Sequence, residues 1–285
     1  MRINHNISAM ITQSALYSTN LSLSTSLQRL STGLRINSAA DDAAGLGVSE
    51  NLRTQVNGTA QANRNAQDGI AALNIAEGAA NEVSSMLQRM RELAVQSAND
   101  TFTSTERAYS QQEFNALQSE IDRISNVTNY NQQQLISTAA GRFGAVGLGG
   151  AQSTLWVDAN SKNGVDSITI SIGTITTGAT GLNIATQNVT TQTDSINAIS
   201  SIDTALNSVN SIRANLGAYV NRLEHAINNL NVSNTNQQAA ESSIRDVDFA
   251  SETSQYTKNQ ILMQSGTAML AQANAIPSSV LTLLK

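Results

Sequence analysis

Apolar side chains recur at helical spacing at both ends of the chain. Near the amino terminus, Leu16, Leu23 and Leu30 lie seven residues apart, and Leu27 and Leu34 complete an alternating rhythm of three and four. Near the carboxyl terminus, a second stripe of this kind consists of Leu262, Gly266, Met269, Ala273, Ile276, Val280 and Leu283. Such stripes predict amphipathic helices that need a partner to cover their apolar side.

These two terminal segments are also almost free of charge. Residues 3–28 contain no Asp, Glu, Lys or Arg, and Lys258 is the only such residue between 253 and 284. Chain ends are usually polar and mobile, so this pattern is unusual. The uncharged side opposite each stripe indicates that a second partner covers it. We therefore expect the ends to pair with each other and then with other copies of the molecule.

Heptad character returns in the interior of the chain. It is strongest between Leu73 and Ala94, between Phe114 and Ile124, and between Ile199 and Leu230, where only Arg213 interrupts the seam. A weaker segment covers residues 43–56. We expect a helix of roughly 30 residues around the first of these segments, about 45 Å long. The positions predicted to form the core of these helices are Leu73, Val83, Leu87, Met90, Phe114, Leu117, Ile121, Leu206, Val209, Leu216, Val220, Leu223 and Ile227.

Two capping boxes are expected at helix starts. Thr103 is followed three residues later by Glu106, and Ser38 is followed by Asp41 in the same way. In this pattern each side chain accepts a hydrogen bond from a backbone N–H group that the first helical turn leaves free. The patterns predict helices that begin just after Thr103 and Ser38.

The helical rhythm is lost between residues 139 and 187. Glycines cluster at 141–150, and short β-forming runs follow at 154–157 and 167–172, with the turn signal Asn163-Gly164 between them. These features predict a small β-hairpin region. The predicted fold class is mainly α: an elongated antiparallel helical bundle or coiled coil that carries this hairpin region, with its two termini paired.

Composition supports this picture and narrows the chemistry. Aromatic residues make up 4% of the 285 residues and charged residues 13%, about half the usual ~25%. The net charge of −5 and the lack of a basic patch argue against nucleic acid. No apolar run reaches the ~18 residues that a membrane-spanning helix needs, and the amino terminus lacks the apolar core of a signal peptide.

No constellation of residues suggests catalysis. The chain has no cysteine, and its two histidines, His5 and His225, are too few for an ordinary zinc site. It has no HExxH, GxSxG or phosphate-loop motif, and the pair Asp41-Asp42 is better explained as a helix cap. We therefore expect no catalytic residue, metal or cofactor.

Four blocks of sequence resemble bacterial flagellin. They are Ile3–Met10 (INHNISAM), Leu30–Leu46 (LSTGLRINSAADDAAGL), Gln88–Asn99 (QRMRELAVQSAN) and Ala273–Leu284 (ANAIPSSVLTLL). The resemblance covers about residues 1–138 and 190–285, and it implies a structural subunit that self-assembles into the flagellar filament for motility. It implies an inner paired-helix domain of residues 1–42 and 246–285. It also implies a rod-like domain of 43–138 and 188–245, with 139–187 as its β-hairpin region and no outer domain.

The resemblance also implies partners and a location. Identical subunits would pack through the two terminal stripes, and the chain would be exported unfolded through the flagellar type III apparatus, without a cleaved signal peptide, to the extracellular filament. Family partners would include an export chaperone, cap and hook-junction proteins. A Toll-like innate receptor recognises many flagellins; the positions that match its motif here are Arg89, Leu93, Gln96 and Glu113.

Two other classes of protein remain open at this stage. A hook–filament junction protein would share flagellin-like ends, although the block at 88–99 favours the filament subunit. A secreted coiled-coil effector or adhesin would form a discrete monomer or dimer instead of an open polymer. On spacing alone, the face around Leu93 is also explained as the solvated flank of a helix.

Overall fold

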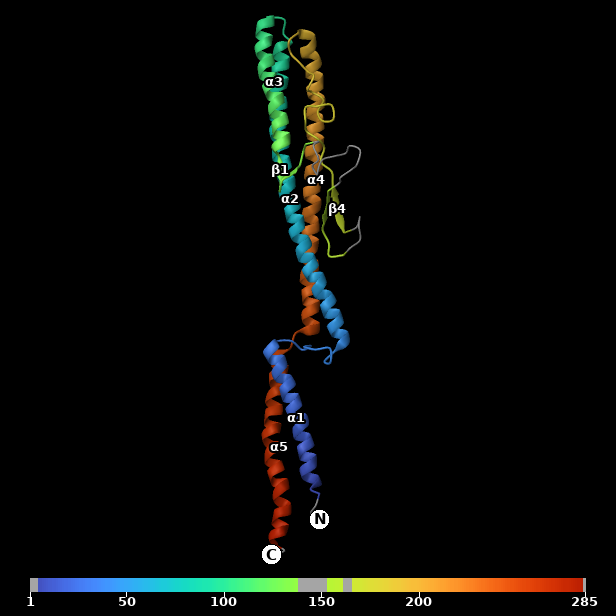
Figure 1. Ribbon diagram of the computed structural model, residues 1–285, viewed down its shortest axis with the longest axis vertical. Helices are drawn as coiled ribbons and strands as arrows, with labels where there is room; N and C mark the ends of the chain where they lie inside the picture. Colours follow the sequence, from blue (N-terminus) through green and yellow to red (C-terminus); the bar gives the residue numbers. More distant parts are fainter. Residues whose placement is uncertain (1–4, 138–152, 161–165, 284–285) are drawn as a thin grey trace. The chain divides into compact units, whose positions relative to one another are not determined.

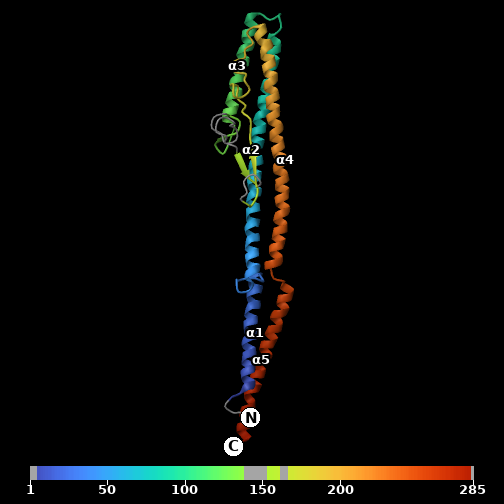
Figure 2. The same ribbon diagram turned by 90° about the vertical axis from the view of Figure 1, so that its right-hand side faces the viewer.

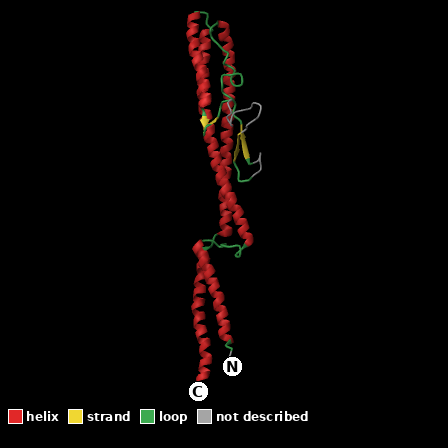
Figure 3. Ribbon diagram, in the orientation of Figure 1, coloured by secondary structure: helices red, strands yellow, loops and turns green. Residues whose placement is uncertain are grey.

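A computed structural model describes residues 5–137, 153–160 and 166–283, the last eight by their backbone alone (Figure 1). The secondary structure is dominated by helices (Figure 3). The elements are α1 (Ile7–Thr32), α2 (Ala43–Ser97), α3 (Ser104–Val127), β1 (Asn129–Tyr130), β2 (Gln133–Gln134), β3 (Ser153–Trp156), β4 (Ser167–Ile170), α4 (Gln192–Arg245) and α5 (Phe249–Leu283). The chain divides into a terminal unit, residues 1–54 with 236–285, and a central unit, residues 55–235.

The terminal unit is built on α1 and α5, which lie side by side and run antiparallel (Figures 1 and 2). Asn6 caps α1 by accepting a hydrogen bond from the Ala9 N–H at 3.1 Å, and its amide nitrogen donates to the Ala273 carbonyl of α5 at 2.8 Å. Gly33 ends α1 with a φ of +73°, a left-handed conformation that glycine adopts without strain.

The two segments that follow α1 and precede α5 are tied together within the terminal unit. Leu34 and Asp246 form an isolated antiparallel bridge, and the Val247 N–H donates to the Gly33 carbonyl at 3.0 Å. The guanidinium of Arg35 donates to the Ile244 carbonyl at 2.6 Å, which satisfies an acceptor near the end of α4. These contacts fix the beginning of α5 next to the end of α1.

The predicted cap at Ser38 is wrong, whereas the cap at Thr103 is confirmed. The carboxylate of Asp41 accepts hydrogen bonds from the N–H groups of Asn37 and Ser38 at 3.2 and 2.9 Å, so it closes a turn and starts no helix. The next residue, Asp42, caps α2 by accepting from the Gly45 N–H at 2.8 Å. Thr103 and Glu106 form the reciprocal capping box of α3. The expectation that the Asp41-Asp42 pair caps a helix is therefore confirmed at Asp42, and only the capping box at Ser38 is wrong.

The central unit packs α3 and α4 antiparallel to α2 (Figures 1 and 2). Its core is aliphatic and follows the seams of these helices, with Leu87, Met90, Phe114 and Leu223 fully buried. The interruption at Arg213 is explained by an ion pair across the seam, because its guanidinium lies 2.9 Å from the carboxylate of Glu77 on α2.

Helix α2 is longer than the sequence pattern suggested. The weak segment at 43–56 and the strong segment after it belong to one helix of 55 residues, about 83 Å long, instead of a separate helix of roughly 30 residues. Between the two segments Ala62 and Ala66 are buried, so small side chains continue the seam. Our expectation did not extend the seam through residues 57–72, where these alanines continue it.

Strands β3 and β4 form the expected antiparallel pair, with Ser153 opposite Ile170 and Trp156 opposite Ser167. The turn signal Asn163-Gly164 and the glycine cluster lie outside the described residues. After β4 the chain forms no strand as far as α4 but packs against α3 as a buried loop: the Thr177 N–H donates to Asp122 at 2.9 Å. The buried apolar residues of this loop are Ile172, Ile175, Leu182, Ile184 and Val189.

Candidate subunit-packing surface

The seam between α1 and α5 is made mainly of small and polar side chains. On α1 the positions that turn towards α5 repeat at three and four residues, and on α5 the same rhythm faces α1. Only Ser26, Asn259 and Ala273 along these two rows are buried, and the others are half-buried. The rows are Ala9, Thr12, Leu16, Thr19, Leu23, Ser26 and Leu30 on α1, and Glu252, Tyr256, Asn259, Met263, Gly266, Leu270 and Ala273 on α5.

Close approach of the two helices depends on one glycine. A Cβ atom at Gly266 would lie 2.7 Å from Cδ2 of Leu16, well inside van der Waals contact. Glycine at this position lets the leucine of α1 rest directly on the backbone of α5. The large side chain thus comes from one helix and the space for it from the other.

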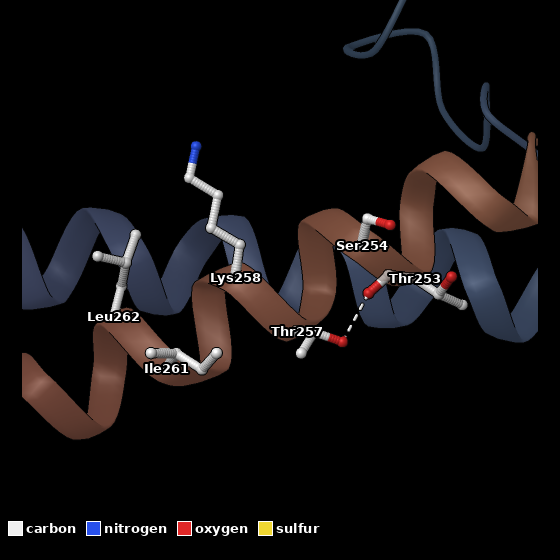
Figure 4. Close-up of a pocket in the computed structure, with 6 residues that line it drawn as sticks. All are labelled: Thr253, Ser254, Thr257, Lys258, Ile261 and Leu262. Atoms are coloured by element: carbon white, nitrogen blue, oxygen red, sulfur yellow. Dashed lines mark hydrogen bonds between the residues drawn. The ribbon is translucent and has the colours of Figure 1, made fainter.

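The large apolar side chains of this helix pair point mostly outwards. Ten that point outwards are each at least 47% exposed, and one face of α5 with Ile261 and Leu262 is shown in Figure 4. Burying a side chain of this size is worth about 1.5–3 kcal/mol, and an exposed series of them marks an interaction surface. We call this set the outer face; it consists of Ile7, Met10, Ile11, Tyr17, Leu21 and Leu27 on α1 and Phe249, Ile261, Leu262 and Met269 on α5.

Hydroxyl groups near the outer face are satisfied by their own helix. The Thr257 hydroxyl donates to the Thr253 carbonyl at 2.8 Å (Figure 4), and that of Thr25 on α1 donates in the same way to the Leu21 carbonyl at 3.0 Å. A partner can therefore cover these residues without leaving an unpaired donor, because the hydrogen bond is made inside the helix. Lys258 is the one charged group on this stretch of α5.

The predicted packing residues divide between the two sides of the helix pair. Those on the inner side are half-buried, and those on the outer side are exposed. The half-buried ones are Leu16, Leu23, Leu30 and Leu34; the exposed ones are Leu27, Leu262 and Met269. The side chains of Ile276, Val280 and Leu283 lie outside the described residues.

In the central unit, the residues expected in the helix core are all covered to some degree. Nine are buried: Leu73, Val83, Leu87, Met90, Phe114, Ile121, Val209, Leu216 and Leu223. The half-buried ones pack against this cluster: Leu117, Leu206, Val220 and Ile227. Both units share the same periodicity, but the central seam buries large apolar residues, whereas the buried residues of the terminal seam are small or polar.

The face expected to match the innate-receptor motif is held by ion pairs. Arg89 on α2 lies 2.8 Å from Glu113 on α3 and 3.0 Å from Glu92, and the hydrogen bond to Glu113 raises the pKa of its guanidinium. Gln96 is exposed, but Leu93 is only 2% exposed and belongs to the core. Leu93 therefore offers no exposed apolar anchor.

The described residues show no catalytic or metal-binding arrangement. His5 and His225 are both exposed, and no group of three His, Cys, Asp or Glu side chains is placed to hold a metal ion within the described part of the chain. Among the same residues, no helix has the length and hydropathy that crossing a bilayer requires.

One polar cluster in the terminal unit was missed by the sequence patterns. Arg29 on α1 faces Glu252 on α5, with 3.7 Å between Nη1 and Oε2, and the buried Asn259 lies on the same groove. The available signal was Asn259 itself, a polar residue exactly seven positions before Gly266 in the row that faces α1.

Comparison with known proteins finds family models that match both halves of the sequence. The model of the bacterial flagellin N-terminal helical region matches residues 3–140, and that of the C-terminal helical region matches residues 199–284. Flagellin FlaB2 of Treponema pallidum is 44% identical over 289 residues, and the flagellar filament 33 kDa core protein of Treponema phagedenis is 45% identical over 292 residues; each alignment covers 100% of both chains.

Among solved structures, Bacillus cereus flagellin is 30% identical, with a TM-score of 0.49, over 59% of this chain and 88% of that one. The family is structural and carries out no catalysis, which agrees with the absence of a catalytic motif from the sequence. The chain therefore belongs to the bacterial flagellin family and is a structural subunit of the flagellar filament.

Proposed function

We propose that the terminal unit is the part of the subunit that packs against other copies in the filament. The inner domain would consist of residues 1–42 and 246–285. The single observation that carries this proposal is the outer face, where large apolar residues of α1 and α5 remain exposed around a seam of small and polar ones. Two helices alone leave this surface in water, and identical neighbours would bury it.

An open polymer requires contacts that do not close on themselves. A contact between two different surfaces of identical subunits propagates as a helix unless its rotation closes a ring. The α1 and α5 parts of the outer face differ in sequence, so a neighbour can meet one with the other. This asymmetry supports head-to-tail packing of copies along the filament and distinguishes the subunit from a closed coiled-coil dimer.

The rod-like domain would comprise residues 43–138 and 188–245, with 139–187 as its β-hairpin region. Its role is mechanical in this proposal. The apolar residues of α2, α3 and α4 already pack against one another in its own core, so they do not need a neighbouring subunit. A rod with a buried core transmits torque without rearranging. No outer domain is assigned.

Export through the flagellar type III apparatus as an unfolded chain is part of the same proposal, as are the extracellular location and delivery without a cleaved signal peptide. An export chaperone, a cap protein and hook-junction proteins are the further partners that the family suggests. The lack of cysteine and the single proline support this route, since neither disulfides nor several slow proline isomerisations would delay folding after export.

Recognition by a Toll-like receptor is a separate and weaker proposal. Arg89, Gln96 and Glu113 are exposed and would form the contact, whereas the burial of Leu93 counts against an apolar anchor. Binding of purified monomer to the receptor ectodomain tests it, and no binding at micromolar protein would refute it.

The packing proposal is tested by placing a charge on the outer face. Ile11→Asp and Met269→Asp each introduce a carboxylate that a neighbour would have to bury without a partner, so salt-induced polymerisation should be lost. Ile11→Val keeps the face apolar and serves as the matched control. Sedimentation and electron microscopy report assembly, and circular dichroism confirms that the monomers keep their helices. Normal filaments from both aspartate variants would overturn the proposal.

A further inference from the structure

The terminal unit contains an ion pair that is close but makes no hydrogen bond. Arg29 Nη1 and Glu252 Oε2 are 3.7 Å apart, and the two side chains are 30% and 13% exposed. A nitrogen and an oxygen at this distance are attracted as charges, but a hydrogen bond needs about 3.2 Å or less. Partly buried charges of this kind are stable only when further hydrogen bonds satisfy them.

Two hydrogen-bond donors next to this pair have no acceptor. The Nε atom of Arg29 and the Nδ2 atom of Asn259 are both shielded from solvent, and within the described residues neither donates a hydrogen bond. Asn259 as a whole is 5% exposed, so water has little access to its amide. A buried donor left without an acceptor destabilises the folded state. The helix pair is therefore incomplete at this position.

The unsatisfied groups line a groove between α1 and α5 that also opens to the outside. Its walls include Ser22 and Ser26 of α1 and Gln255 of α5, next to Arg29, Glu252 and Asn259. Both donors are shielded in the monomer, so the Arg29 and Asn259 side chains would turn towards a side chain that enters the groove, and the Glu252 carboxylate would supply an acceptor. A carboxamide fits this combination, because its oxygen accepts and its NH₂ group donates. A carboxylate would be attracted by Arg29 but repelled by Glu252, and an ammonium group the reverse, whereas a neutral carboxamide is repelled by neither.

We propose that this groove, the Arg29–Asn259 pocket, receives an Asn or Gln side chain from a neighbouring copy of the chain. The inference rests on the proposed packing of terminal units. It is supported by the charge of the surface that a neighbour offers: residues 3–28 have no charged side chain, and 253–284 have only Lys258. The exposed carboxamides on these helices are Gln13, Asn20, Gln28, Gln260, Gln264, Gln272 and Asn274.

The pocket would set the register of packing between subunits. Apolar surfaces attract without direction, so two outer faces can slide past each other with little change in buried area. A polar residue in an apolar helix interface selects one register, because every other register leaves it unpaired. The carboxamide therefore acts as a positioning group, and the outer face supplies most of the affinity.

Solid-state NMR of mixed filaments tests the contact directly. Monomers that carry ¹⁵N arginine are co-polymerised with monomers that carry ¹³C asparagine and glutamine, so any transfer between the two labels crosses a subunit boundary. A cross-peak between Arg29 Nε and a carboxamide carbon is expected, and Arg29→Lys identifies it by its loss. Filaments in which Arg29 Nε has no carboxamide neighbour, or contacts only water, would overturn the proposal.

Variants test the effect on register. Asn259→Leu removes the buried amide, and we expect its critical concentration for assembly to rise about tenfold, with more than one helical lattice in its filaments. Thr267→Ala is the control, because the exposed Thr267 hydroxyl donates only within α5, to the Gln264 carbonyl at 2.8 Å. An unchanged critical concentration and a single lattice for Asn259→Leu would contradict a role in register.

The two levels of the proposal fail in different ways. If filaments form, and Ile11→Asp abolishes them while Arg29 shows no carboxamide contact, the packing role stands and the pocket's role is refuted. If Ile11→Asp and Met269→Asp both assemble normally, the packing role is refuted, and with it the pocket's role. The NMR experiment detects the contact in the unmodified full-length chain, so it tests the pocket even if Asn259→Leu fails to fold.

Discussion

The terminal and central units use one helical periodicity in opposite ways. In the central unit the seam positions carry large apolar residues such as Leu87 and Leu223, and both are fully buried. In the terminal unit the seam contains Ser26 and Asn259, while Ile11 and Met269 are at least 60% exposed. A single chain therefore completes the core of one unit and leaves the apolar surface of the other exposed, which copies would cover in the proposed packing.

This difference explains why the terminal segments have so few charges. A helix whose outer side remains in water usually carries charged residues there. In the terminal unit the outer side is apolar or carries hydroxyls bonded to their own helix, as in Thr25 and Thr257. Such a surface suits burial more than solvation, so under the proposed packing the stability of the terminal unit should rise with assembly.

The largest effect should come from removing the terminal helices. Deleting residues 1–30 or 260–285 removes one half of the α1–α5 pair, so polymerisation should be abolished. The central unit should keep its helicity and melting temperature, because its core lies within residues 55–235. Sedimentation after salt-induced assembly and thermal circular dichroism measure the two quantities. Polymerisation of either truncated chain into normal filaments would contradict the comparison.

Leu87→Asp or Leu223→Asp should instead unfold the central unit, which the terminal deletions leave intact. Both leucines are fully buried, and an unpaired carboxylate in their place should destabilise the central unit by roughly several kcal/mol. Val95→Asp provides a control on α2, since Val95 is 49% exposed and its replacement should change the stability little. Thermal melting checks this prediction, and an unaltered melting curve for Leu87→Asp would count against it.

A smaller effect should distinguish two glycines. Gly217 on α4 has no atom within 4 Å of a built Cβ, so Gly217→Ala should stabilise the central unit by about 1 kcal/mol. This change should raise its melting temperature by roughly 2–4 °C. In Gly266→Ala, Leu16 of α1 would have to move, so the same substitution should weaken assembly. If Gly266→Ala lowered the critical concentration instead, the close contact of α1 and α5 would be in question.

The smallest effect concerns pH. Hydrogen bonds from Thr103 lower the pKa of Glu106 below its ordinary value of 4.5. A carboxyl group with a lowered pKa in the folded state contributes stability above its unfolded pKa, and the contribution disappears as the pH falls through the folded pKa. Thermal melts of Glu106→Gln between about pH 6 and pH 3 should therefore show a slightly weaker loss of stability on acidification than the parent chain. The same or a steeper loss would contradict the role of this cap.

The sequence allowed the helices and the family to be predicted, because long heptad runs and terminal blocks specify both. It did not show which side of each terminal helix faces its partner. Leu16 and Leu27 both fit the predicted stripe, yet only Leu27 is exposed. The deciding residue is Gly266, because the absence of a side chain there leaves room for Leu16 to pack against α5. The sequence placed Gly266 in one stripe with Leu262 and Met269, which the structure shows to be exposed, so the pattern did not separate the two sides.

Other features depended on contacts that no local pattern reveals. The loop after β4 is held by Asp122, which is more than fifty residues away in sequence, so its burial could not be read from its own composition. The β1–β2 hairpin turns through Asn131 and Gln132, both with positive φ, and only the asparagine gave a weak signal. The Arg29–Asn259 pocket likewise joins residues from opposite ends of the chain.

Hydrogen exchange of the monomer and of the filament tests the central claim most directly, with the core of the central unit as internal reference. In dilute monomer, the amides of α1 and α5 should exchange much faster than those around Leu87. In filaments, the amides of the two terminal helices should become strongly protected while those of the reference change little. Terminal helices that are already as protected in the monomer as in the filament would contradict the account.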